Sequence, residues 1–225
     1  MHFIDGIKRL LISYVDNDSY RNLRVLNKDW YSKIPKLDSK IYHYIINGKK
    51  SDGIMDMFIN QSNKIPKRVE SLELVNFNYN AEINKMFPKL NCLTDLQFTE
   101  SKILMDNYKI PQKIENIIFS GCKFGELFDK IDLKILPTNL KTLVIVNNKL
   151  LRTEIINYPK KLKFLYIHSD KFNKELINLP NLEKLLIESS NFNKPLYNLP
   201  NSLKELSIVS NKFNQPLNYL PNIKN

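Results

Sequence analysis

Few residues of the sequence could take part in covalent chemistry or bind a metal ion. The chain has two cysteines, Cys92 and Cys122, and three histidines, His2, His43 and His168. The cysteines lack the CxxC spacing of a zinc or redox site, and no histidine has a nucleophile or carboxylate at a suggestive spacing. Because Cys122 falls in a regular apolar pattern, we expect it to be buried rather than to act as a nucleophile.

Sequence motifs for nucleotide, metal or acyl chemistry are also missing. The sequence contains no P-loop and no GxGxxG, HExxH or GxSxG motif. Without a convergent set of acid, base, nucleophile and metal ligands, the sequence predicts no catalytic residue, no metal and no cofactor. We therefore expect a protein that is not an enzyme.

The net charge is a second possible source of function. The 225 residues include 34 Lys or Arg and 23 Asp or Glu, a formal charge of +11, which can indicate an acidic partner such as nucleic acid. However, the charge is spread along the chain without a long basic block. Asn, Lys, Ile and Tyr, the residues of AT-rich codons, are all abundant, so genome composition explains much of the lysine content. Nucleic acid is not the expected partner.

The N-terminal run MHFIDGIKRLLISYV does not predict a membrane protein. Asp5, Lys8 and Arg9 interrupt its apolar residues, no small-residue cleavage site follows, and the run is too short to span a bilayer. With two cysteines and no disulfide framework, a soluble intracellular protein, cytoplasmic or nuclear, is expected.

The elements that must position any functional side chain form a repeat. A ten-residue phrase occurs three times, as FNKELINLPN at 172–181, FNKPLYNLPN at 192–201 and FNQPLNYLPN at 213–222. Prolines recur every 20 to 26 residues, and apolar residues with LxxLxLxxNxL spacing follow them. This is the period of a solenoid, in which each LxL strand buries its side chains against neighbouring copies. The prolines are Pro66, Pro88, Pro111, Pro137, Pro159, Pro180, Pro200 and Pro221.

Three further expectations follow from this pattern. Phe172, Phe192 and Phe213 should fill the core, and the 26-residue gap between Pro111 and Pro137 should bulge from the convex face. At the position of the repeat Asn, a polar side chain should reach backbone groups inside the turn. That position holds Ser101, Cys122, Asn148, Asp170, Ser190 and Asn211.

The ladders resemble the leucine-rich repeat, and the FNxPLxxLP phrase is similar to the FNIP subtype known from amoebae and giant viruses. The resemblance covers about seven copies over residues 65–225, in an array that could continue beyond the chain end. It implies an α/β repeat protein, with a leucine-rich-repeat solenoid whose parallel β-sheet lines the concave face. If the source is viral, the host cytoplasm is the implied compartment.

Residues 1–45 have helical spacing instead. Ile7, Leu10, Leu11 and Tyr14 fall at i, i+3, i+4 and i+7, and DNDS at 16–19 can start a second helix. The stretch LLISYVDNDSYRNLRVLNKDWYSK resembles an F-box, although Phe3, Ile4, Gly6 and Asn27 depart from the family pattern. Residues 46–64 are predicted as a helical linker or cap, within short helices over 41–64.

The F-box resemblance implies a helical head that binds a Skp-family adaptor within a cullin complex. The chain would then be the substrate-recognition subunit of a Skp-cullin-F-box ubiquitin ligase, and the repeats would bind an unidentified target protein. The alternative is a protein-interaction scaffold whose helical head only caps the solenoid. The predicted adaptor-binding residues are Ile7, Leu10, Leu11, Val15, Tyr20, Leu23, Leu26 and Trp30.

The target site is expected on the concave face of the sheet. In each LxxLxL strand, the side chains between the ladder residues must point away from the core and lie in solvent unless a partner covers them. They are mostly polar at the two ends of the array but apolar and aromatic in the middle, which is the composition of an interface core. The predicted substrate-binding residues are Ile118, Val144, Val146, Phe164, Tyr166, His168, Leu186 and Glu188.

One rim of the array is expected to carry a stripe of lysines. The residue just before the last ladder position is a lysine in five copies, and neighbouring strands lie about 4.8 Å apart, so the ammonium groups would form a row. The row could bind acidic partners, or it could reflect codon bias and solvation alone. Its members are Lys102, Lys123, Lys149, Lys171 and Lys212.

Overall fold

The structure is a computed structural model that describes part of the chain. The described residues are 42–47, 69–76, 87–103, 110–124, 130–146, 154–197, 199–217 and 220. All of them belong to one compact unit, residues 42–225. The predicted F-box head with its adaptor-binding residues lies outside the described residues, as do Asn148 and Lys149 of the predicted turn and stripe.

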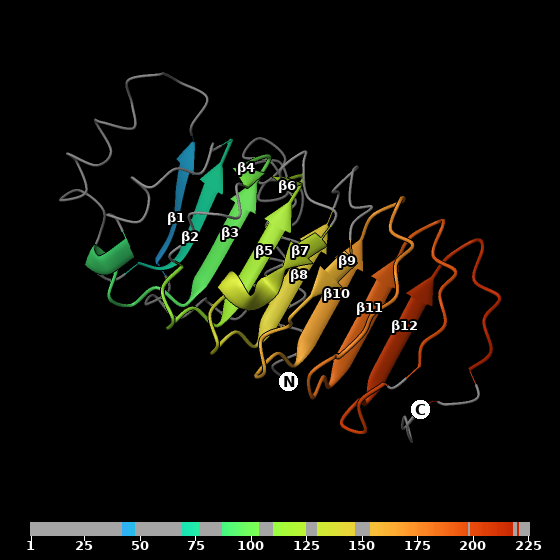
Figure 1. Ribbon diagram of the computed structural model, residues 1–225. Coiled ribbons are helices and arrows are strands. Elements are labelled where there is room, and N and C mark those ends of the chain that lie inside the picture. The colour runs from blue at the N-terminus through green and yellow to red at the C-terminus, as the bar shows by residue number, and fades with distance from the viewer. Residues whose placement is uncertain are drawn as a thin grey trace, which may run out of the picture. The chain divides into compact units, whose positions relative to one another are not determined.

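A single parallel sheet of eight strands organises the described unit (Figure 1). In the first pair of strands Tyr44 lies opposite Leu72, 28 residues later, and the register shifts between Tyr42 and His43. All other neighbouring strands pair residue for residue, and their equivalent positions are between 20 and 26 residues apart along the chain. The prediction of a parallel-sheet repeat solenoid is therefore confirmed. In spatial order the strands are β1 (Tyr42–Asn47), β2 (Val69–Val75), β3 (Asp95–Thr99), β5 (Asn116–Ser120), β8 (Thr142–Val146), β10 (Phe164–His168), β11 (Lys184–Glu188) and β12 (Glu205–Val209).

Alternation along each strand divides the sheet into two faces. Leu165 and Ile167 on β10 are fully buried, whereas the residues before, between and after them are only partly buried. In register, Leu165 pairs with Leu143 on one side and Leu185 on the other, so the inward side chains form continuous apolar rows. Each turn thus buries its ladder against its neighbours, as a solenoid requires.

Stacked phenylalanines continue the core on the return side of the repeat. The rings of Phe172 and Phe192 lie 5.9 Å apart between centroids, and those of Phe192 and Phe213 lie 6.0 Å apart, with planes within a few degrees of parallel. Phe172 and Phe192 are fully buried and Phe213 is partly buried against the same core. These rings fill the core as expected.

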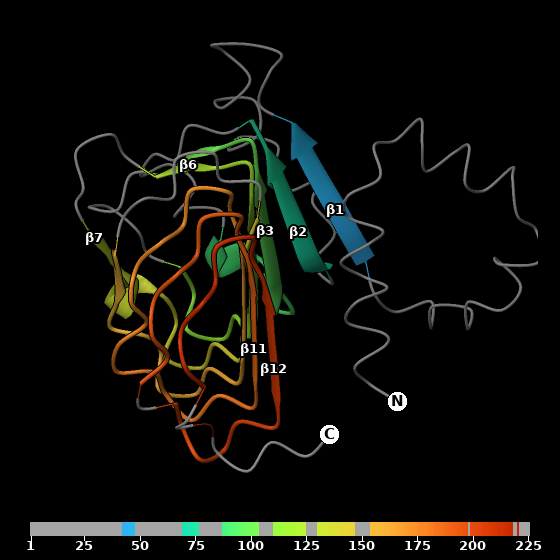
Figure 2. The ribbon, with the colours of Figure 1, turned by 90° about the vertical axis from the view of Figure 1, so that its right-hand side faces the viewer.

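The return segments lie on one side of the sheet and contain little regular structure (Figure 2). Among the described residues they comprise a ladder of β4 (Lys102–Ile103) with β6 (Lys123–Phe124), a ladder of β7 (Lys130–Asp132) with β9 (Glu154–Ile156), and two 3-10 turns, η3 (Phe87–Lys89) and η5 (Leu133–Ile135). The described residues contain no α-helix, so the α/β expectation is wrong for this part of the chain. Prolines in the return phrase remove backbone donors and oppose helix formation there.

Two segments contain regular structure that the sequence did not predict. The expected bulge between Pro111 and Pro137 contains β7 and η5, and it contributes Leu133 and Leu136 to the core. Residues 42–47, expected within short helices, form strand β1, which pairs in parallel with β2. The sequence YHYIIN is rich in aromatic and β-branched residues, which favour a strand, and a short apolar run does not by itself distinguish strand from helix.

The turns that leave the main strands are of two kinds. In the left-handed turns, the second residue after the last inward strand residue has a positive φ: Asn76 at 57°, Glu100 at 49° and Gly121 at 62°. In the serine turns, this position holds a serine: Ser169, Ser189 and Ser210. Both kinds send the N–H of this residue to the next strand, as from Gly121 to Val146 and from Ser189 to Val209.

The two kinds of turn bury different residues. The left-handed turns bury the third residue, Ser101 or Cys122, whose side chains donate to the carbonyls of Leu74 and Phe98 at 3.2 Å. Two of the serine turns bury the second residue instead, Ser169 and Ser189, whereas Ser210 is partly buried; Ser189 Oγ donates to Phe172 O at 2.8 Å. The expectation of an inward polar side chain is therefore confirmed for Ser101 and Cys122 and is wrong for Asp170, Ser190 and Asn211, which are exposed.

Candidate protein-binding face

The sheet surface that points away from the core, here termed the outer face, is composed of three rows of side chains. Strand register aligns these rows across the strands from β2 to β12. The middle row changes in character along the array, from charged and polar through apolar and aromatic to polar. It reads Glu73, Gln97, Ile118, Val144, Tyr166, Leu186 and Ser207.

The central strands bring the predicted substrate-binding residues together. Tyr166 lies between Val144 and Leu186 in register, and Ile118 flanks Val144 on the other side. Ile118, Phe164, Tyr166 and Leu186 are partly exposed, as are His168 and Glu188, and we term these six the apolar cluster.

Two members of the prediction do not contribute free surface. Val144 and Val146 are 0% exposed although they lie on the outer face and outside the core cluster. In register, Val144 lies between Ile118 and Tyr166, whose side chains are partly exposed. The expectation that these two valines face solvent is wrong.

The polar end of the cluster carries a histidine and a carboxylate side by side. His168 Nδ1 lies 4.0 Å from Glu188 Oε2, and the side chains are 38% and 41% exposed. The His168 imidazole also lies against the ring of Tyr166, with 6.4 Å between centroids. Such an arrangement gives the cluster one polar border that can accept or donate hydrogen bonds.

At the β2 and β3 end, the outer face is polar but closed. Gln97 Nε2 donates to Glu73 Oε1 at 3.1 Å, and Thr99 Oγ1 donates to the same carboxylate oxygen at 2.6 Å. Glu73 and Gln97 are 7% and 6% exposed. The sequence predicted polar side chains in solvent here, whereas the structure buries both and links them to each other.

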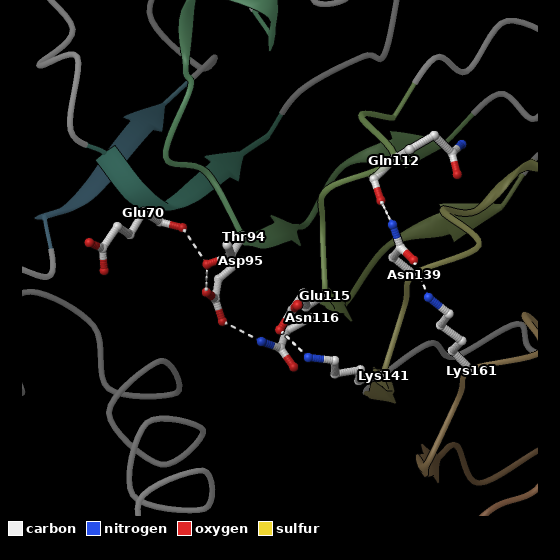
Figure 3. A network of polar contacts seen from close by, with 9 residues as sticks. All are labelled: Glu70, Thr94, Asp95, Gln112, Glu115, Asn116, Asn139, Lys141 and Lys161. Carbon is white, nitrogen blue, oxygen red and sulfur yellow. Dashed lines mark hydrogen bonds and ion pairs between the residues drawn. The ribbon is translucent and has the colours of Figure 1, made fainter.

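The strands enter the sheet beside a rim of polar and charged side chains. Asn116 donates to Asp95 at 2.9 Å, and Lys141 pairs with Glu115 at 2.8 Å (Figure 3). Farther along the rim, Glu183 accepts from Lys163 at 2.6 Å and from Lys204 at 2.8 Å. Hydrogen bonds from these lysines hold the pKa of Glu183 at about 2.

Sequence reasoning missed this rim, although the signal for it is present. Glu115, Lys141, Lys163, Glu183 and Lys204 all occupy one repeat position, directly before a strand. Parallel strands in register place such residues side by side, so opposite charges at this position predict cross-turn ion pairs.

The lysine stripe is partly observed on the opposite rim. Lys102 on β4 and Lys123 on β6 are direct partners in register, and both are exposed, as are Lys171 and Lys212. Asn191 occupies the intervening position in the copy between Lys171 and Lys212 and donates to Asp170 O at 2.6 Å. The stripe is therefore interrupted, and whether it binds acidic partners remains a prediction.

Metal-binding geometry is not assembled in the described part of the chain. No group of three or more His, Cys, Asp or Glu side chains there could hold a metal ion. Cys122 is buried as expected, and burial raises the pKa of its thiol to about 12. None of the helices described has the length and apolar character needed to cross a bilayer.

One shallow hollow lies on the return side, with a volume of about 250 Å³. It is open and carries two basic and two acidic side chains, so its charge favours neither anions nor cations. Its lining consists of Glu154, Ile155, Lys174, Glu175, Ile177 and Lys194.

Comparison with known proteins adds no assignment. No protein-family model matches the chain, and no significantly similar curated protein was found.

Proposed function

We propose that the chain is the substrate-recognition subunit of a Skp-cullin-F-box ubiquitin ligase and that the outer face binds the target protein. The observation that carries the binding half of this proposal is the apolar cluster, partly exposed on three strands, β5, β10 and β11, of one sheet. The adaptor half is supported by the F-box resemblance of the N-terminal sequence.

The proposed mechanism is proximity. The chain performs no covalent step; it holds a target lysine near a charged conjugating enzyme and so raises its local concentration. A strand-borne cluster suits this role because the backbone of the sheet fixes the positions of its side chains before the target arrives. We also propose, from the resemblance of the repeat phrase, that the solenoid is a leucine-rich repeat of the FNIP subtype.

The chemistry of the cluster defines the kind of target. Phe164 and Tyr166 are large and have few rotatable bonds. They lie two positions apart on β10, in neighbouring rows of the outer face, so they can act as anchors in an apolar pocket of the target. Lys184, paired with Glu205 at 2.8 Å, and Glu188 border them with opposite charges. A protein surface with an apolar centre and a mixed polar rim fits this arrangement.

The target site is tested by Phe164→Ser with Tyr166→Ser in the full chain. Proteins captured from cell lysate by the immobilised chain should fall at least about tenfold in amount, because a hot-spot pair is lost. Ile177→Ser with Tyr197→Ser, which changes two exposed side chains of the return segments, is the matched control and should retain capture. The melting temperature must be unchanged. Unchanged capture, or loss only through early melting, would contradict the assignment.

The adaptor site is tested separately. Leu11→Asp with Leu26→Asp in the full chain should abolish co-purification with a Skp-family adaptor while target capture persists, since charges are costly in an apolar interface. If the unmodified chain captures targets but binds no Skp-family adaptor, the scaffold function is the correct one.

A further inference from the structure

One repeat position at the start of the strands forms a continuous row along the array, here termed the entry row. Each backbone N–H of the row donates to the carbonyl of the same position in the preceding turn, as from Lys141 to Glu115 at 2.7 Å and from Lys163 to Lys141 at 2.8 Å. Neighbours within the row are therefore fixed by the backbone. Its members are Glu70, Thr94, Glu115, Lys141, Lys163, Glu183 and Lys204.

The charge of the entry row changes sign along the array. From β2 to β5, this row and the outer row next to it contain three carboxylates, Glu70, Asp95 and Glu115, and no lysine. From β8 to β12, the same two rows contain four lysines and two carboxylates. Figure 3 shows the change, with Glu70 and Asp95 toward one end and Lys141 and Lys161 toward the other.

The basic part of the entry row has more lysines than its carboxylates can neutralise. Glu183 accepts from two lysines of the row, at 2.6 and 2.8 Å, so one positive charge remains in excess there. Lys160 and Lys161, just before β10, are exposed, and Lys161 donates to the neutral amide oxygen of Asn139 at 2.8 Å. Neither lysine forms an ion pair with a described side chain. This surplus of positive charge attracts carboxylates.

The apolar cluster borders this basic part directly. Phe164 follows Lys163 along β10 and pairs in register with Lys184 on β11. The border of the cluster at the other end of these strands holds His168 and Glu188, and no lysine among the described strand residues. A partner seated on the aromatic rings therefore meets surplus positive charge on one side only.

We propose that the target is recognised through a linear segment in which an apolar side chain lies beside two or more acidic side chains. The apolar side chain contacts Phe164 and Tyr166, and the acidic ones contact the lysines of the entry row. This inference rests on the proposed function, since it takes the apolar cluster as the target site. Lys163 and Tyr166 are three residues apart on one strand, about 10 Å, so an extended segment should place its acidic residues within about three positions of the apolar one.

A nucleic acid fits this surface less well than an acidic peptide. Aromatic rings beside lysines also suit a single-stranded nucleic acid, but its backbone carries a negative charge at every phosphate. These phosphates would pass over Glu183, Glu188 and Glu205, whereas the separate carboxylates of a peptide bind between them. The aliphatic side chains of Ile118 and Leu186 favour an aliphatic partner group over a stacked base.

Selection of phage-displayed random peptides on the immobilised full chain tests the proposal. Enriched peptides should combine an apolar residue with at least two Asp or Glu residues within about three positions of it. The most enriched sequence is then made as a fluorescent peptide, and its affinity is measured by anisotropy. Lys141→Gln with Lys163→Gln should weaken binding at least about tenfold, because two cations of the entry row are lost.

Two further variants separate the entry row from net charge. Glu183→Gln should tighten binding, because it releases two lysines from their shared carboxylate. Lys171→Gln with Lys212→Gln makes the same change in net charge on the opposite rim; it is the matched control and should leave the affinity unchanged. Thermal unfolding checks that each variant stays folded.

The outcomes distinguish this inference from the proposed function. If Phe164→Ser with Tyr166→Ser abolishes peptide binding but the enriched peptides are not acidic, or Lys141→Gln with Lys163→Gln binds normally, this inference alone fails. Peptides whose affinity does not depend on the two aromatic rings contradict the proposed target site as well. Equal weakening in the control variant, no enrichment over a bare support, or displacement of the peptide by random-sequence single-stranded DNA would also overturn the inference.

Discussion

The left-handed turns after β2, β3 and β5 and the serine turns after β10, β11 and β12 connect a strand to the next core residue in different ways. Both separate the last inward strand residue from the next core plug by five positions, as from Phe98 to Ile103 and from Ile187 to Phe192. In the left-handed turns a positive φ sends the third residue inward. In the serine turns, Phe192 N–H closes onto Ser189 O at 3.1 Å and the second residue is inward. Equal spacing therefore does not imply an equal inward position.

The region of the serine turns and the region of the left-handed turns also differ in regularity. In the serine-turn region, equivalent residues of neighbouring strands are 20 and 21 positions apart, and three phenylalanine rings are stacked. In the left-handed region, equivalent residues of neighbouring strands are 24, 21 and 26 positions apart. The return segments there also contain β4, β6, β7 and η5. We expect the stability of the serine-turn region to depend on ring packing, and that of the left-handed region to depend on backbone conformation as well.

The largest expected effect tests the ring stack. Phe192→Ala removes the central ring of three and should lower the free energy of unfolding by about 3–5 kcal/mol, the range for a buried aromatic. Phe213→Ala should cost less because this ring is only partly buried. Equilibrium denaturation with hydrogen exchange of the β11 and β12 amides measures both. Equal losses would show that the stack does not depend on its central member.

The next effect separates the inward position from its neighbour. Ser189→Ala leaves the buried Phe172 carbonyl without its side-chain donor and should cost about 1–3 kcal/mol. Ser190→Ala, one residue later and exposed, should stay within about 0.5 kcal/mol. Thermal and urea unfolding of the two variants gives the comparison. A larger loss of stability in Ser190→Ala than in Ser189→Ala would show that Ser190 is the inward residue, as the sequence pattern predicted.

A backbone substitution tests the left-handed turns. Gly121→Ala meets no close atom, the nearest being Glu100 Cγ at 3.6 Å, but it places a Cβ at φ 62° and should cost about 1–2 kcal/mol. Gly121→Asn should cost less, because Asn76 adopts φ 57° at the equivalent position. If alanine and asparagine cost the same in denaturant unfolding, conformation is not what distinguishes these turns.

The smallest effect concerns pH and the rim of the serine-turn region. Two lysines lower the pKa of Glu183 from 4.5 to about 2, so the folded state favours its charged form. This contribution is present above about pH 4.5 and is lost as the pH falls toward 2. Because the pairs are solvent-exposed, it should not exceed about 1 kcal/mol. Glu183→Gln should flatten stability against pH below 4.5, and Glu115→Gln, which loses a single lysine pair, should change it less. An unchanged acid limb in Glu183→Gln would contradict the pairing.

The inward ladder was predictable because its physical cause is local. Leu143, Leu165 and Leu185 are buried as the LxL alternation requires. The sequence prediction placed the inward turn residue at the same position in every copy, because one consensus pattern was applied to all of them. The two kinds of turn were therefore not distinguished. A distinguishing signal existed: Gly121 and Asn76 favour a positive φ, whereas serine favours the first position of a β-turn. Strand β1 was missed because six apolar and aromatic residues fit either period.

The outer face was predicted in composition but not in exposure. The alternation that makes Tyr166 face outward also applies to Val144 and Glu73, yet both of these are buried. Burial of an outward side chain depends on its neighbours in other strands and on what lies above them. A pattern within one strand carries no information on either, so Val146 and Gln97 could not be distinguished from exposed residues by sequence alone.

The even spacing of Phe172, Phe192 and Phe213 has a consequence for how the length of such a chain can change. If the segment from one of these rings to the next were duplicated, the inserted copy would have the same ring stack, serine turn and strand register with both of its neighbours. The array would lengthen by one strand, about 4.8 Å, with no other contact altered. Unequal recombination within this stretch therefore yields folded products, whereas the same event among β4, β6 and β7 would unpair a ladder. Variation in repeat number among descendants of this sequence should be concentrated in its C-terminal half.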